Sequence, residues 1–385
     1  MADQLAYVII TPHSLHKSRT GGILARLLTR TGLDLVAARM FSPGGELVSA
    51  YSEKIVSSAD PQDRRIQELI RDYILRNLSP DLRTGKRRRV MMLVFRGEDA
   101  VRKVRTVVGN IRFGQPGGET IRDTYGDLVV EESGRVSYFE PAVLAAPNAE
   151  EATDKLKLWA KFSDSDGGLL ENIAPVSESV PNQRTLVLIK PDNFRFPTGR
   201  PGNVIDFFSR TGLFIAAIQV HRMSVAEAVE FYGPVIPTLH RHYKGIAETK
   251  ASPLIEKELG CALPEGVRQS LGELLGPIAG DNQFNNLVRF MAGHAPHELA
   301  TARHGEPGTE KCIALVYEGP EAVRKIREVL GPTDPSKAPT GTIRREFGQT
   351  VMINAAHASD SPDNAEREIA IIKPGANRLK ALAGF

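Results

Sequence analysis

The sequence has little of several features that mark particular classes of protein. Cys261 and Cys312 are its two cysteines in 385 residues, and their spacing matches no metal motif. Reduced thiols are therefore expected rather than a disulfide framework. No apolar run approaches the length of a membrane span, and no basic segment precedes the first apolar run. We expect a cytoplasmic protein with no signal peptide and no membrane contact.

An excess of either charge is also missing. Lysine and arginine number 49 against 46 aspartates and glutamates, a formal net charge of +3. This balance argues against an extended nucleic-acid groove, although it leaves room for a local anion site. The dense basic run at Lys86–Arg89 is interpreted as a solvated loop before a strand, with a polyanion contact as the alternative.

The glycine patterns that usually bind nucleotides are absent as well. The Gly85-Lys86 dipeptide has Pro80 where a P-loop requires its first glycine, and no G-x-G-x-x-G follows a strand. Any phosphate site in this chain must therefore be built from side chains.

What the sequence does contain is an internal repeat. Its longest matching part is an apolar run, a turn with proline, a glycine-rich loop, an amphipathic helix, Arg-Thr-Gly and a second apolar run. The matching segments are 7–40 with 186–220, 93–109 with 315–331, and 120–122 with 342–344. Two copies of one domain are therefore predicted.

The spacing between equivalent residues grows along the chain. It is 179 for Pro12 and Pro191 but 222 for Arg105 and Arg327, so the second copy holds about 40 extra residues. At 385 residues, two domains are also the natural expectation. The predicted organisation is a first copy at 1–165, a linker at 166–183, and a second copy at 184–385 with an insertion at about 233–310.

The order of elements predicts the fold class. Each copy alternates strand, helix, strand, strand, helix, strand, which indicates an α+β, ferredoxin-like antiparallel sheet with helices. In the second copy, strands are expected near 184–190, 213–222, 311–317 and 349–354, and helices near 202–211, 224–232, 320–330 and 362–371.

Several side chains of the second copy suit a phosphate site. Lys190 follows the first strand, Arg327 lies on a predicted helix, and Thr333 and Arg344 follow in turn segments. Guanidinium groups bind phosphate through paired hydrogen bonds, and an ammonium group acts as a point charge. Each residue also has an ordinary structural interpretation as a strand end, a solvated helix face or a turn.

His357 is expected on a short connection between the apolar run at 349–354 and the next helix. Ser361 and Pro362 are a strong helix start, and Glu368 follows two turns later. A carboxylate beside an imidazole fixes its tautomer and leaves the second nitrogen nucleophilic.

Taken together, these motifs resemble nucleoside diphosphate kinase. The resemblance rests on Leu186–Asp192, Leu315–Gly348 and Ile353–Ile369, and it spans nearly all of 184–373 apart from the insertion. The order Asn-x-x-His-x-Ser-Asp-Ser, from Asn354 to Ser361, is that family's signature.

The resemblance implies a ping-pong phosphoryl transfer from ATP to a nucleoside diphosphate through phospho-His357. Lys190 is then expected to neutralise the transferred group and Glu368 to orient the imidazole, with Tyr232 beside the histidine. The residues implied to contact the nucleotide are Lys190, Arg327, Thr333, Arg344, Val351 and Asn354. Mg²⁺ is expected to bridge the phosphates, with no direct protein ligand and with Asp360 reaching it through water. A homo-oligomer with weak base selectivity is also implied.

The sequence departs from the family at two positions and in one segment. Ala358 replaces the usual glycine after the histidine, and Arg345-Glu346 replaces Gly-Asp, but neither change removes a reacting group. The insertion contains two expected helical stretches, 266–276 and 282–293, interpreted as a lid or an oligomer contact.

The first copy has lost most of these residues. Thr11 stands where Lys190 does, whereas Arg105 and Arg122 match Arg327 and Arg344. No histidine lies between His16 and His221, and Glu140–Ala142 are expected in the neighbourhood of the missing one. The first copy is therefore predicted not to form a phosphoenzyme, although weak nucleotide binding stays open.

Two alternatives to the kinase are kept. A non-catalytic nucleotide sensor or scaffold is disfavoured because it has no need of Lys190, His357 and Glu368 together. Transfer of the phosphoryl group from His357 to a partner protein is compatible with the same residues.

Overall fold

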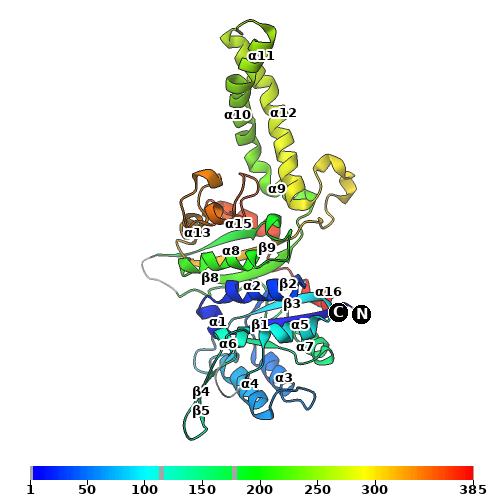
Figure 1. Ribbon diagram of the computed structural model, residues 1–385, viewed down its shortest axis with the longest axis vertical. Helices are drawn as coiled ribbons and strands as arrows, with labels where there is room; N and C mark the ends of the chain where they lie inside the picture. The colour runs from blue at the N-terminus through cyan, green and yellow to red at the C-terminus, as the bar shows by residue number, and fades with distance from the viewer. Residues whose placement is uncertain (1–2, 112–116, 176–179, 385) are drawn as a thin grey trace. The chain divides into compact units, whose positions relative to one another are not determined.

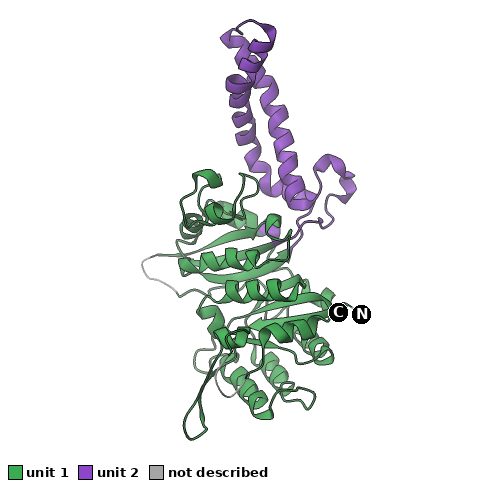
Figure 2. Ribbon diagram, viewed as in Figure 1, with its two compact units in different colours: residues 1–220, 313–369, 373–385 green, residues 221–312, 370–372 purple. Residues whose placement is uncertain are grey.

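The computed structural model describes residues 3–111, 117–175 and 180–384. Contacts divide the chain into two compact units (Figure 2). Unit 1 comprises residues 1–220, 313–369 and 373–385 and holds the sheets of both copies; unit 2 comprises 221–312 and 370–372 and holds the insertion. Residues 176–179 of the predicted linker lie outside the described residues.

The first copy is built on a four-stranded sheet of order β2-β3-β1-β6 (Figure 1). Its strands are β1 (Asp3–Ile10), β2 (Asp34–Phe41), β3 (Val90–Glu98) and β6 (Val143–Ala145), and a separate hairpin joins β4 (Asp127–Val130) to β5 (Val136–Glu140). Its helices are α1 (Pro12–His16), α2 (Thr20–Thr31), α3 (Gly45–Glu53), α4 (Arg64–Asn77), α5 (Ala100–Val108), α6 (Ile121–Tyr125) and α7 (Ala149–Lys161).

The second copy repeats this arrangement in a sheet of order β10-β7-β9-β8. Its strands are β7 (Asn182–Ile189), β8 (Phe214–His221), β9 (Cys312–Pro320) and β10 (Ala356–Ala358). Its α-helices are α8 (Arg200–Phe208), α13 (Ala322–Leu330), α14 (Ile343–Phe347), α15 (Pro362–Ile372) and α16 (Leu379–Ala383), with short 3₁₀ turns at Pro191–Asn193, Ser209–Thr211 and Pro335–Lys337. The predicted α+β class with two antiparallel sheets is confirmed.

The central strands explain why their sequences are continuous apolar runs rather than alternating ones. β1 and β7 each lie between two other strands, and the last five residues of each are buried. A strand covered on both faces has no solvent side, so the period-two pattern is lost. The pairing is antiparallel in both sheets, β1 with β3 and β7 with β9.

The strand predicted at 349–354 is wrong. The backbone amides of Gln349 and Thr350 both donate to the carbonyl of Ile353, which makes this segment a turn. Ala355 then adopts a left-handed conformation with φ of 69°, and pairing with β7 begins only at Ala356. Apolar residues alone did not make a strand here, because strand formation depends on a pairing partner. His357 therefore lies within β10, not on the connection after it.

The place of the missing histidine in the first copy was also predicted wrongly. β5, which contains Glu140, pairs with β4 outside the main sheet. The counterpart of β10 is β6, since Leu144 pairs with Ile9 of β1 as His357 pairs with Leu188 of β7. Leu144, rather than Glu140–Ala142, occupies the position of the histidine.

The two copies meet through the same helix of each, α2 and α8, which lie side by side (Figure 1). Close approach is possible because glycines face each other. A Cβ atom on Gly21 would come within 2.5 Å of the Gly202 carbonyl oxygen, and one on Gly202 would meet the Gly21 oxygen as closely. Equivalent surfaces of the two copies thus form an internal pseudosymmetric contact.

Unit 2 is helical. Its α-helices are α9 (Val225–Tyr232), α10 (Ile236–Ile246), α11 (Ser252–Leu259) and α12 (Glu265–Ala292), and its shorter turns are Gly233–Val235, a π-helical turn at Ala247–Ala251, Pro296–Glu298 and Thr301–Arg303. The two helical stretches expected in the insertion are one helix, because α12 continues through Pro277. Among the described residues, no helix has the length and apolarity needed to span a bilayer.

Candidate active site

His357 lies at the middle of β10 with its side chain 23% exposed. Its Nε2 atom is 3.0 Å from Oε2 of Glu368, a buried carboxylate on α15. When Nε2 carries the hydrogen that this carboxylate accepts, the lone pair of the ring is on Nδ1. The predicted pairing of these two residues is therefore present in the geometry of the site.

Ser359 is a member of the site to which the sequence analysis gave no role. Its Oγ donates a 2.7 Å hydrogen bond to the same Oε2 atom of Glu368, and the backbone amide of Leu186 donates to Oγ at 3.3 Å. The hydroxyl group thus links the carboxylate to β7. The spacing of two residues from the histidine would have pointed to this serine if the extended segment had been predicted at the histidine.

The start of α15 follows the predicted capping pattern. Ser361 is the N-cap, its Oγ accepting from the amide of Asn364 at 3.1 Å, and Pro362 is the first helical residue. The side-chain amide of Asn364 also donates to Asp360, and this hydrogen bond holds the pKa of Asp360 below its usual value. Asp360 is therefore ionised near neutral pH.

Lys190 ends the central strand and is buried, with 5% of the residue exposed. Its Nζ donates to Oδ1 of Asn354 at 2.9 Å and to the carbonyl of Met352. Burial lowers the pKa of Lys190 to about 8, and the positive charge of Arg344 adds to this while Asp192 opposes it. The ammonium group is thus pre-positioned but weakly solvated.

Asn354 connects several of the predicted residues. While its Oδ1 accepts from Lys190, its Nδ2 donates to the backbone carbonyls of Val351 at 2.8 Å and Thr333 at 3.1 Å. Val351 itself is 57% exposed, and Thr333 is exposed as well. Because one buried amide joins three segments, the turn at 349–354 is held against the loop after α13.

The two arginines differ in their surroundings. Arg344 is buried, and its guanidinium group donates to the carbonyls of Gly331 at 3.0 Å and Ala356 at 3.2 Å, next to His357. Arg327 is exposed on α13 and lines an open cavity of about 480 Å³ together with Asp360. Arg344 is therefore locked in place, whereas Arg327 has room to move.

Tyr232 and a metal ion complete the list of expectations. Tyr232 ends α9 in unit 2 and makes an edge contact with Phe231; its place beside the histidine stays a prediction. Within the described ranges, no cluster of three or more histidine, cysteine or acidic side chains is arranged to hold a metal ion. Asp360, which lines the cavity with Arg327, is an oxygen donor of the kind that Mg²⁺ prefers, and an ion carried by substrate phosphates stays a prediction.

The equivalent positions of the first copy carry different chemistry. Leu144 replaces His357, and the same spacing from Leu144 along α7 places Lys155 where Glu368 lies. Lys155 is buried and paired with Glu151 at 2.6 Å. Thr11 replaces Lys190 and donates to Glu140 at 2.8 Å. The imidazole, its carboxylate partner and the ammonium group of the second copy are therefore all replaced in the first.

The two arginines that the first copy retains are engaged by its own groups. Arg105 pairs with Asp60 at 2.9 Å, with both side chains largely buried. Arg122 donates to the carbonyl of Gly109 at 3.0 Å and to the side chain of Gln62 at 3.4 Å. A phosphate group would have to displace Asp60 to reach Arg105.

Comparisons with known proteins bear on the family to which this chain belongs. The family model described as nucleoside diphosphate kinase matches residues 278–376. The nucleoside diphosphate kinase of Staphylothermus marinus is 31% identical over 190 residues, which cover 49% of this chain and 92% of that protein. That of Campylobacter hominis is 31% identical over 193 residues, covering 50% and 96%.

Among solved structures, the NDP kinase from Pyrobaculum aerophilum is 28% identical to this chain, covers 50% of it and 95% of its own length, and has a TM-score of 0.35. That score is too low to support an argument about the fold. The sequence matches span nearly the full length of the relatives, and on this ground the chain belongs to the nucleoside diphosphate kinase family.

Proposed function

We propose that this protein transfers the γ-phosphoryl group of ATP, or of another nucleoside triphosphate, to a nucleoside diphosphate by a ping-pong mechanism through His357. The observation that carries the proposal is the 3.0 Å contact between Nε2 of His357 and the buried carboxylate of Glu368. It supports a tautomer in which Nδ1 is the nucleophile.

In the first half-reaction, Nδ1 forms a bond to the γ-phosphorus, and the bond from that phosphorus to the bridging oxygen breaks. The nucleoside diphosphate leaves with the electron pair. In the second half-reaction, a terminal oxygen of another nucleoside diphosphate attacks the same phosphorus and releases the imidazole. Glu368 stabilises the positive charge that develops on the ring, and Ser359 keeps the carboxylate in position.

The cations of the site take the phosphate charges. Lys190, held by Asn354, neutralises the group in transfer, and Arg344 and the exposed Arg327 hold the other phosphates with the Thr333 hydroxyl. Asn354 contacts the ribose and phosphate, and Val351 offers one apolar wall to the base. Because so little surrounds the base, selectivity among bases is expected to be weak.

Mg²⁺ supplies further neutralisation of the phosphates when it enters with the nucleotide. Asp360, whose pKa is lowered and which lines the cavity with Arg327, is the residue that would reach the ion through water. The site also positions the reacting groups, and the buried hydrogen bonds around Asn354 support this role.

We assign the activity to the second copy, residues 184–385, and propose that the first copy, residues 1–165, is a non-catalytic half connected by residues 166–183. The insertion near 233–310 takes no assigned part in the reaction. Tyr232 is proposed to pack beside His357, as in the family.

The test is intact-mass spectrometry of the wild type and His357→Ala after incubation with ATP and Mg²⁺ at neutral to basic pH. We expect one acid-labile phosphate on the wild type, none on the variant, and discharge when GDP is added. A wild type that binds ATP but stays unphosphorylated would contradict the proposed kinase activity and favour a nucleotide-binding scaffold.

A further inference from the structure

The insertion contains a helical hairpin in which small residues of α12 are buried and several large apolar residues of the same helix are exposed. In unit 2, α10 packs against α12. Gly276 and Gly280 of α12 face α10, and the buried Gly272 faces Glu248 of the π-helical turn that follows α10. A Cβ atom on Gly276 would lie 3.0 Å from the His240 carbonyl oxygen. The hairpin thus closes through small residues, so its two backbones lie close together.

Four large apolar residues in the first half of α12 lie on another face. Val267, Leu271, Leu274 and Ile278 are spaced by four, three and four residues. At 3.6 residues per turn they form a stripe whose centre is about 170° around the helix from the three glycines. α10 therefore leaves Val267, Leu274 and Ile278 exposed, Leu274 by 67% and Ile278 by 68%, whereas Leu271 is half-buried.

This spacing is that of a coiled-coil seam. Apolar residues that recur every three and four positions are those through which two similar helices pack knobs into holes. The stripe runs from Val267 to Ile278, and its residues are branched aliphatic side chains of the kind found at such seams. A second copy of the same stripe is the partner that this pattern fits.

The charges beside the stripe favour the same partner. Arg268 is paired with Glu256 at 2.6 Å, and Glu273 is paired with Lys244, both within the hairpin. With these side chains already neutralised, the surface offers no excess charge to nucleic acid or to an anionic membrane. The surface that complements this stripe is therefore another apolar helix face of low net charge.

We propose that the α12 stripe, defined as Val267, Leu271, Leu274 and Ile278, is a self-association surface through which two copies of this chain pair as a helical bundle. The pairing is isologous, with the same residues on each side. This proposal does not rest on the phosphotransfer reaction.

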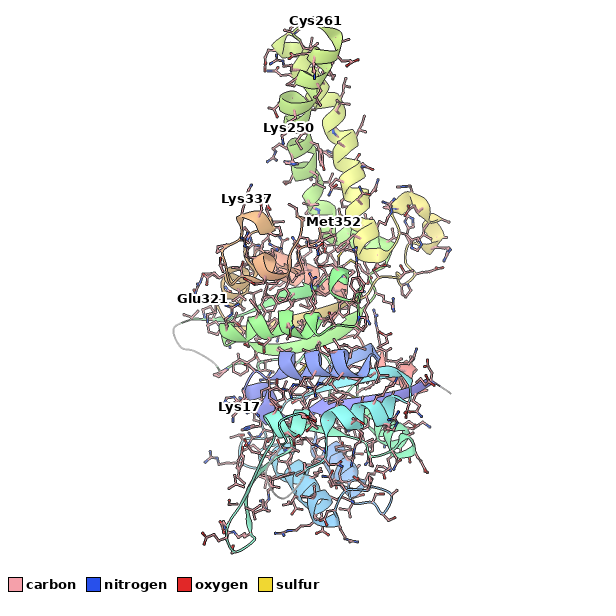
Figure 3. All side chains as sticks on the ribbon, in the orientation of Figure 1. Lys17, Lys250, Cys261, Glu321, Lys337 and Met352 are labelled. Atoms are coloured by element: carbon pink, nitrogen blue, oxygen red, sulfur yellow. The ribbon has the colours of Figure 1, made fainter. Side chains whose placement is uncertain are left out.

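The hairpin can be located in Figure 3 by Cys261, an exposed residue in the connection between α11 and α12.

The test is sedimentation velocity on the full-length chain. The double variant Leu274→Glu with Ile278→Glu is compared with Leu254→Glu with Leu259→Glu, which adds the same charge at equally exposed leucines of α11. We expect the first variant to sediment with half the mass of the wild type and the second to keep the wild-type mass. Circular dichroism checks folding, and Leu274→Ser with Ile278→Ser replaces the first variant where folding is lost.

Three results would overturn the proposal. One is a stripe variant that keeps the wild-type mass. Another is loss of mass in both variants, which would mean that exposed leucines act without regard to position. The third is a wild type that already sediments as a monomer, which would leave no self-association for the stripe to mediate.

Discussion

The two copies of one domain in this chain share a fold but carry different side chains at the positions of the candidate active site. In the second copy, β10 presents His357 to Glu368, and Lys190 ends the central strand. In the first copy, the equivalent strand presents Leu144, and Lys155 and Thr11 replace the other two groups. The sheet order is unchanged. The comparison shows that the scaffold does not depend on these three side chains, because the sheet keeps its strand order when all three are replaced.

The difference extends to the arginines. Arg344 and Arg122 make the same kind of contact, with the carbonyls of Gly331 and Gly109 respectively. Arg327 stays exposed beside a cavity, whereas Arg105 is closed off by Asp60. In the first copy these cations contribute to folding, because each satisfies groups of its own chain.

The largest expected effect comes from removing the imidazole. His357→Ala should lower kcat by at least about 1,000-fold, because the variant lacks the imidazole that is proposed to accept the phosphoryl group. Coupled measurement of nucleoside triphosphate formation checks this. Activity that survives in the variant would point to a second phosphorylated residue and would erase the contrast between the copies.

The next effect is on pH dependence. Since burial lowers the pKa of Lys190 to about 8, the free protein loses this positive charge as pH rises through about 8, and kcat/KM should then fall about tenfold per unit. Lys190→Arg keeps its charge over this range, so its profile should stay flat at a lower level. Identical profiles for the two proteins would mean that Lys190 does not control the decline.

A smaller effect is expected at Ser359. Ser359→Ala removes the 2.7 Å hydrogen bond that holds Glu368, and a bond to a charged group is worth about 1.5–3 kcal/mol. We expect kcat to fall about tenfold.

Ser361→Ala is the matched control for Ser359, since it removes an N-cap of the same helix. It should lower the free energy of unfolding by about 1 kcal/mol and leave kcat unchanged. Equal losses of kcat in the two variants would show that Ser359 acts only through the stability of α15.

The smallest effect on catalysis is expected in the first copy. Asp60→Ala leaves the largely buried Arg105 without its carboxylate, which should lower the free energy of unfolding by about 1–2 kcal/mol in urea titrations. Turnover should not change. A variant with lower turnover and unchanged stability would contradict the structural role given to this pair.

Much of the site was predictable from the sequence because it depends on local rules. Ser361 and Pro362 set the start of α15, and from that start Glu368 falls within reach of His357. Lys190 was predicted at the end of a strand because the apolar run before it is continuous. The expected phosphate contacts were grouped from their charges and hydroxyl group, whereas Asn354 and Val351 were added only through the family resemblance.

The errors came from features that are not local. The turn at 349–354 is apolar but finds no partner strand, so composition misled the prediction. Leu144 was missed because the spacing between copies falls from 222 at Arg122 and Arg344 to 213 at Leu144 and His357. The hairpin of β4 and β5 lies between these points in the first copy. The unbroken α12 was missed because packing against α10 offsets the cost of Pro277.

The most direct test of the contrast between the copies is to locate the phosphate. The wild type is incubated with ATP and Mg²⁺, digested at alkaline pH and analysed by mass spectrometry of its peptides. We predict one phosphate per chain, on the peptide that contains His357. Phosphate on a peptide from residues 1–165, on His13 or His16 for example, would contradict the assignment of all the chemistry to the second copy.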